Sequence, residues 1–232
     1  MSGAALKRVV GVLRRPRATL RDVAAAPRWA GLLVAITITA AAANATLMNT
    51  EVGRQALVDQ WERTALALGQ TVDDARYAEL QELSGNGAVY GVLSAAINVP
   101  AVVFLVAVLL HVGFGRRQSN VPFVAVLAVV THTGVLLALR QIVAAPIAYA
   151  RETTASATSR GVWFPAFDEA SPLARFLGLM DLFTIWWALV LAVGVSMIYH
   201  SRTARLAAAF VGLYAGLAVV LAIAMAVLGR SS

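Results

Sequence analysis

Four polar side chains lie inside long apolar runs of this sequence, where their chemistry differs from that of surface groups. They are Asn98, His132, Arg140 and Asp181. Ionisable groups are costly in an apolar medium, so they pair with one another or form proton relays. Two interpretations follow. These groups could carry protons or a small solute through a membrane, or they could be satisfied packing residues.

Arg140 and Asp181 are the strongest charged pair among them. Arg140 lies near the end of the third apolar run, and Asp181 lies near the start of the fourth. Because the connection between these runs brings the two ends to the same side, we expect the side chains at similar depth, where they could form an ion pair. The alternative is that each side chain reaches separately to the headgroups.

Asn98 and His132 define a second polar position. Pro100 follows Asn98 and predicts a kink whose freed carbonyls need partners. His132 lies between two threonines at a comparable depth, so a hydrogen-bonded cluster near the midplane is one hypothesis. The other is that His132 is satisfied within a packed helix.

Five apolar runs must position these groups, and each has about the 20 residues that a membrane-spanning helix needs. The hydrophobic content of 59%, charged content of 13% and mean hydropathy of +0.74 exceed those of ordinary soluble domains. We therefore predict an all-α polytopic membrane protein with five transmembrane helices. The predicted spans cover about 29–48, 89–114, 122–147, 179–199 and 206–228.

Known reaction centres are missing from the sequence. There is no cysteine, which excludes disulfides, thiolate metal sites and cysteine nucleophiles. No Gly-rich phosphate loop, serine nucleophile elbow or His-Glu-x-x-His motif occurs, and the carboxylates lack calcium-loop spacing. We predict no enzyme activity, no cofactor and no metal site.

The arginines predict the orientation of the chain. Seven basic residues precede the first span, and the second and fourth connections carry two arginines each. Since cytoplasmic flanks retain Lys and Arg, we expect the segment 1–28 to be cytoplasmic. Loops 49–88 and 148–178 and the tail 229–232 then lie outside. The arginine-rich, alanine-rich composition is typical of a high-GC bacterial genome, so we expect the inner membrane of a bacterium.

The N-terminal segment combines an apolar stripe with a basic face. Leu6, Val9, Val10 and Leu13 recur at helical spacing. The basic residues on the other side are Lys7, Arg8, Arg14 and Arg15. This pattern predicts an amphipathic helix at the membrane surface that contacts anionic lipid headgroups, not nucleic acid; a solvated basic tail is the alternative.

Shorter signals follow this helix. Pro16 should interrupt it, and Thr19 with Asp22 resembles a capping box that opens a second short turn. In the loop 49–88, an apolar stripe before Gly69 predicts one helix, and Asp73 and Asp74 favour the first turn of another. This acidic hairpin could dock a partner or act as a spacer.

Small residues predict where helices approach closely. Ala188 and Ala192 share one side of the fourth span with Asp181, and the fifth span carries Gly212 and Gly216 in a Gly-x-x-x-Gly pattern. Packing within the monomer and homodimerisation both fit the two glycines, and we prefer packing within the monomer.

Three stretches carry a family resemblance. They read RVVGVL with PRATLRDV and PRW before the first span, FVAVLAVV at 123–130, and DLFTIWWA at 181–188 continuing to 194. The chain resembles the Ypt-interacting protein (Yip) domain family. The resemblance implies five spans and a cytoplasmic N-terminus. Eukaryotic members are associated with Rab-type GTPases and vesicle traffic. For this chain we expect the topology of the family, but not GTPase binding, and the resemblance implies no catalytic residue.

Three functions are consistent with these sequence features. The first is a non-enzymatic inner-membrane protein that organises lipid or partner proteins through its basic N-terminus and acidic hairpin. The second is a small-solute or proton-coupled transporter that uses Asp181, Arg140 and His132. The third is an accessory subunit of a larger membrane complex.

Overall fold

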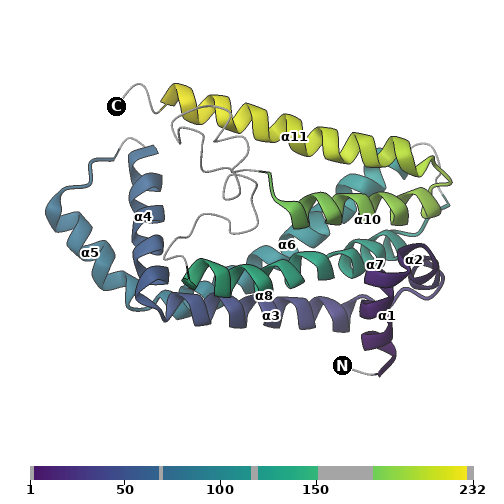
Figure 1. The fold of residues 1–232 in the computed structure, drawn as a ribbon, viewed down its shortest axis with the longest axis horizontal. Helices are drawn as coiled ribbons and strands as arrows, with labels where there is room; N and C mark the ends of the chain where they lie inside the picture. Colours follow the sequence, from purple (N-terminus) through teal and green to yellow (C-terminus); the bar gives the residue numbers. More distant parts are fainter. Residues whose placement is uncertain (1–2, 68–69, 116–119, 151–179, 229–232) are drawn as a thin grey trace.

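The computed structural model describes residues 3–67, 70–115, 120–150 and 180–228, and every regular element in this part is a helix. The long apolar helices lie side by side along the length of the molecule (Figure 1). They are α3 (Ala30–Met48), α6 (Gly87–Gly115), α7 (Phe123–Thr133) with α8 (Val135–Ala150), α10 (Leu182–Ile198) and α11 (Thr203–Leu228).

The protein is a multi-pass membrane protein, as predicted. Four helical segments are long and apolar enough to cross a membrane, with α7 and the first half of α8 counted as one segment. The fourth predicted span is shorter than expected, because α10 begins at Leu182 and has 17 residues. Asp181 precedes it in an extended conformation and caps it, so the helix cannot begin at residue 179.

The third predicted span is one path made of two helices. α7 ends at Thr133, and α8 begins after Gly134. Two threonines bond back to the preceding turn, Thr131 to the Leu127 carbonyl at 2.8 Å and Thr133 to the Val130 carbonyl at 3.0 Å. Such back-bonding competes with the backbone ladder and bends helices.

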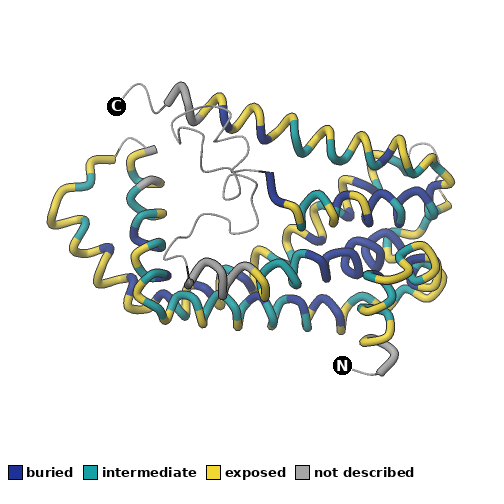
Figure 2. Tube along the Cα trace, viewed as in Figure 1, coloured by how far each residue is buried: buried dark blue, intermediate teal, exposed yellow. Residues whose placement is uncertain are grey.

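α7 lies at the centre of the bundle. Every residue from Ala125 to Thr133 is buried, in contrast to the outward faces of α6 and α11 (Figure 2). Apolar residues of α6, α7 and α10 make up most of the main core. An apolar sequence buried on all sides is the pattern of a central bundle helix.

The N-terminal segment forms two helices, α1 (Gly3–Arg14) and α2 (Pro16–Ala25), which lie at one end of the bundle (Figure 1). The helix is interrupted at Arg15, directly before Pro16, which confirms the predicted break at this proline. The capping-box prediction was wrong, because α2 begins at Pro16, three residues before Thr19. Proline suits the first helical position, where its missing N–H costs nothing.

Both helices contribute side chains to the core. The predicted amphipathic helix at the membrane surface did not include this burial. Val12, Leu20 and Val23 are at most 1% exposed and join the main core cluster. Leu6 and Val10, from the predicted apolar stripe, remain 55% and 41% exposed. The segment therefore has an inner apolar face against α7 and α10 and an outer face that combines apolar and basic side chains.

At the opposite end, α4 (Glu51–Ala67) and α5 (Asp74–Ser84) form the predicted hairpin (Figure 1). Asp73 caps α5 by accepting a bond from the Arg76 N–H at 2.8 Å. The hairpin is fixed to α6 by an edge contact between Trp61 and Tyr90, whose ring centroids are 5.5 Å apart.

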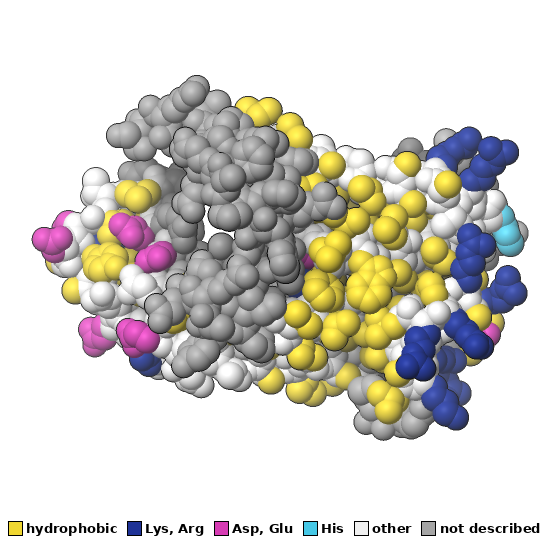
Figure 3. Space-filling view, viewed as in Figure 1, with side chains coloured by type: hydrophobic (Ala, Val, Ile, Leu, Met, Phe, Trp, Pro, Cys, Tyr) yellow, Lys and Arg dark blue, Asp and Glu magenta, His cyan; other side chains and the backbone are white. Residues whose placement is uncertain are grey.

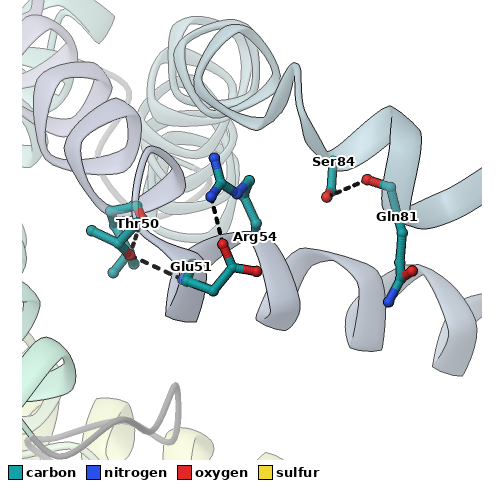
Figure 4. Close-up of polar contacts among 7 residues, drawn as sticks. Thr50, Glu51, Arg54, Gln81 and Ser84 are labelled. Carbon is teal, nitrogen blue, oxygen red and sulfur yellow. Dashed lines mark hydrogen bonds and ion pairs between the residues drawn. The ribbon is translucent and has the colours of Figure 1, made fainter.

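A tight corner joins α3 to α4. The Gly53 N–H donates to the Thr50 hydroxyl at 3.1 Å, and Arg54 pairs with Glu51 in the same turn (Figure 4). A Cβ on Gly53 would lie 2.0 Å from the Leu47 carbonyl oxygen. Only glycine permits this approach, so this corner sets the direction in which the hairpin leaves the bundle.

A substitution at Gly194 tests the central packing. An added Cβ would meet Val129 at 2.5 Å and Leu20 at 3.3 Å, and Val129 is fully buried and cannot move away. We expect Gly194→Ala to destabilise the protein by about 1–3 kcal/mol through overpacking. The unfolding midpoint in detergent measures this. Gly113→Ala is the matched control, because no atom lies within 4 Å of its Cβ position; equal midpoints for both variants would contradict the packing described here.

Candidate functional site: a polar node and a basic end

Asp181 joins three helices inside the bundle. Its Oδ2 lies 3.2 Å from the Arg140 Nε of α8. Its Oδ1 accepts bonds from the Thr184 N–H at 2.9 Å and the Thr184 hydroxyl at 3.2 Å, which caps α10. The Asp181 N–H donates to the Tyr214 hydroxyl of α11 at 3.0 Å. We call Arg140, Asp181, Thr184 and Tyr214 the polar node.

Equal helix lengths bring the two charges together. Asp181 directly precedes the 17 residues of α10, and Arg140 follows Phe123, the first residue of α7, by the same number of positions. At about 1.5 Å per residue, both lie about 25 Å from the helix ends near α1 and α2. A bilayer core is about 30 Å thick, so the pair lies in the half of the bundle that faces the hairpin.

The node is suited to holding helices together. The Asp181 side chain is 6% exposed and that of Arg140 is 35% exposed. Two opposite charges in contact cancel most of the field that each would create in an apolar medium. Because both carboxylate oxygens of Asp181 have protein partners, the geometry favours a structural junction over a carboxylate that exchanges protons with a substrate.

His132 and Asn98 do not join this node or each other. The His132 Nδ1 donates to the Ala128 carbonyl of its own helix at 2.8 Å, and the side chain is buried. The Asn98 amide donates to the Ser94 hydroxyl at 3.0 Å on the exposed side of α6. The hypothesis of a midplane cluster is therefore wrong for the described residues, because His132 is buried and Asn98 is exposed. The other hypothesis, a His132 that is satisfied within its own packed helix, is confirmed. α6 continues through Pro100.

The small residues of the two last helices behave differently. Ala188 and Ala192 are buried against neighbouring helices. Gly212 and Gly216 are exposed, and no atom lies within 4 Å of either Cβ position. The preference for packing these glycines within the monomer was wrong for the part of the chain that is described. α11 packs through Ala218 and Ala222, and Gly216 lies two residues from Ala218, about 200° away around the helix.

Basic side chains gather at the end of the bundle formed by α1, α2 and the turn between α10 and α11, which we call the basic end (Figure 3). Arg8 donates to the Ala26 carbonyl at 3.3 Å, and Arg17 donates to the Thr203 hydroxyl at 3.3 Å, which ties α2 to α11. Arg8 therefore links α1 to the end of α2. Three of the predicted basic residues stay exposed with no bonded side-chain partner among the described residues: Lys7, Arg14 and Arg15.

No metal site accompanies these features: the described residues contain no group of three His, Cys, Asp or Glu side chains that could hold an ion.

Sequence reasoning missed two members of the node. Thr184 had a signal, because an Asp directly before an apolar run is an N-cap pattern, and its side chain accepts from the backbone N–H three residues later. Tyr214 had none, since its contact joins positions 33 residues apart.

Variants at Asp181 and Arg140 separate the ion pair from the cap. Asp181→Asn keeps an oxygen for the Thr184 N–H and loses the charge, so we expect a stability loss of about 1–3 kcal/mol, less than for a fully buried pair because Arg140 is partly exposed. Asp181→Ala also loses the cap and should cost about 1 kcal/mol more. Unfolding in detergent measures both.

The double variant Asp181→Asn with Arg140→Gln should cost less than the two single variants added together, since no lone charge remains. Strict additivity would show that the two side chains do not interact. Glu82→Gln, an exposed carboxylate of α5 with no bonded partner among the described residues, is the control and should leave stability unchanged.

Comparison with known proteins agrees with this architecture. The family model described as the Yip1 domain matches residues 10–226, from the first helix to the last. No curated protein and no solved structure shows a significant match to the chain. The matched region contains α2, the apolar helices from α3 to α10, most of α11 and the hairpin between α3 and α6. The chain therefore belongs to the Yip1 domain family of multi-pass membrane proteins.

Proposed function

We propose that this protein is a non-enzymatic membrane organiser of the Yip type that binds anionic lipid at its basic end and a membrane-protein partner at its acidic hairpin. The observation that carries this proposal is the separation of charge along the bundle. Lys and Arg side chains gather at one end and Asp and Glu side chains at the other, with apolar surface between them (Figure 3).

The basic end supports contact with a lipid surface. Leu6 and Val10 are exposed beside Lys7 and Arg14 on the outer face of α1. Exposed apolar side chains next to cations suit the boundary between acyl chains and headgroups. Each basic residue close to an anionic leaflet contributes about 1 kcal/mol of attraction.

The hairpin supports contact with a protein partner. Residues 49–87 carry seven carboxylates and three arginines. Two of the arginines pair within their own helices, Arg54 with Glu51 and Arg76 with Glu79. Asp74 and Glu82 remain exposed without a bonded side-chain partner among the described residues. This surface would complement a basic face on a neighbouring membrane protein.

The same separation supports an orientation. Positive residues are retained on the cytoplasmic side, so the basic end would face the cytoplasm and the hairpin would face outward in a bacterial inner membrane.

Charge reversal at the basic end tests the lipid proposal. The protein is held in nanodiscs of phosphatidylcholine and floated with phosphatidylglycerol vesicles. We expect Arg14→Glu with Arg15→Glu to reduce recovery at least about tenfold, because four units of charge change near the surface. The matched control, Arg54→Glu with Arg76→Glu, makes the same change at the hairpin and should float like the parent. Equal recovery of both variants and the parent would refute lipid binding at the basic end.

Single cysteines test the orientation, and the parent chain has no cysteine to give a background signal. In intact bacterial cells, a membrane-impermeant maleimide should label Glu82→Cys in α5. Arg202→Cys, in the turn between α10 and α11, should react only after the cells are opened. Labelling in the reverse order would show that the hairpin faces the cytoplasm.

A further inference from the structure

We infer that a groove between α1 and α2 binds the headgroup of one anionic phospholipid. This inference rests on the proposed lipid contact and gives it a defined site. The groove has a volume of about 480 Å3 and opens on the outer face of the N-terminal segment, away from the main core. Its lining combines cations, one carboxylate and exposed apolar side chains.

The groove exists because the two helices meet at a glycine. Arg15 separates α1 from α2, and Pro16 starts α2 at once. Gly11 faces Thr19, and a Cβ on Gly11 would lie 2.4 Å from the Thr19 hydroxyl oxygen. The helices therefore touch at this point, and both residues line the groove.

The charge of the lining selects an anion. Lys7, Arg14 and Arg15 contribute three positive charges and Asp22 contributes one negative charge, which leaves a net charge of +2. All four residues are exposed, and none of the three cations forms a salt bridge with a described side chain. Two guanidinium groups match the geometry of phosphate oxygens, which they can bind in pairs.

The start of α2 adds to this preference. No side chain caps its first turn, and Pro16 at the first position carries no N–H. The N–H groups of Arg17 and Ala18 therefore have no acceptor within the helix, and Ala18 lines the groove. Free N–H groups and the positive end of the helix dipole favour a phosphate beside the arginines.

The apolar part of the lining identifies the phosphate as part of a lipid. Leu6 and Val10 are 55% and 41% exposed and lie in the same groove as the cations. A soluble phosphate would leave them in water, whereas the glycerol backbone and upper acyl chain of a phospholipid would cover them. Asp22, one helical turn beyond Ala18, can accept a hydrogen bond from a headgroup hydroxyl, which phosphatidylglycerol offers.

A substitution that fills the groove without changing its charge tests this site. The purified protein is equilibrated with equal amounts of phosphatidylglycerol and phosphatidylcholine, and native mass spectrometry counts the retained lipids. We expect the parent to retain one phosphatidylglycerol and Ala18→Leu to lose it. Ala25→Leu, also exposed on α2 but outside the groove, is the matched control and should retain the lipid.

Lys7→Met is the second variant; it removes one cation at nearly constant volume and should reduce the preference for phosphatidylglycerol over phosphatidylcholine. This variant decides the question if Ala18→Leu lowers the unfolding midpoint. Excess glycerol phosphate should not displace the lipid, and displacement would overturn the assignment to a lipid. Equal retention of the two lipids by the parent would overturn the selectivity for an anion.

The vesicle flotation assay separates this inference from the proposed function. Ala18→Leu should float with phosphatidylglycerol vesicles like the parent, because its charge is unchanged. If it floats and also retains the bound lipid, the groove is not the site, while the general lipid contact stands. If the Arg14 and Arg15 reversal leaves flotation unchanged, the proposed function fails first.

Discussion

The burial of α7 on all sides is the constraint on which the rest of the structure depends. A helix with no exposed residue from Ala125 to Thr133 needs neighbours around its whole circumference. α6 and α10 pack against part of this circumference, and α2 packs against another part through Leu20 and Val23. The N-terminal segment is thus held by the same apolar burial that holds the bundle, and the basic residues on its outer face occupy fixed positions.

Polar contacts fix the relative positions of the helices, which apolar packing alone does not determine. Apolar packing alone allows one helix to slide along another. A hydrogen bond or an ion pair between two particular side chains fixes the depth and the rotation of both helices. The polar node links α8, α10 and α11 near the hairpin side, and the bond from Arg17 to Thr203 links α2 to α11 at the basic end. Together these contacts fix the start of α10 and attach α11 at its first residue and near its middle, which matters most for α11 because much of its surface is exposed.

The sequence predicted the helices well because their signals are local. Apolar length, the break at Pro16 and the acidic first turn of α5 each act within a few residues. The burial of Val12 in place of Val10 was not predicted, since both faces of α1 carry apolar side chains and only contact with α7 distinguishes them. The outward direction of Asn98 and Gly212 was missed for the same reason. Spacing shows which residues share a face, but not which face meets a neighbour.

The charged residues of this protein fall into two groups, those that bond within the chain and those that remain exposed. Some of the charged side chains make contacts within the chain. Arg8 and Arg17 form hydrogen bonds with it, and Arg140 forms an ion pair with Asp181. Lys7, Arg14 and Arg15 have no such use among the described residues, yet they project from helices that the core holds rigidly. The backbone that carries these cations is already ordered by the core, so an anion that binds them would cost mainly the rotamer entropy of the side chains. This supports the proposed lipid contact on the outer face of α1 and α2.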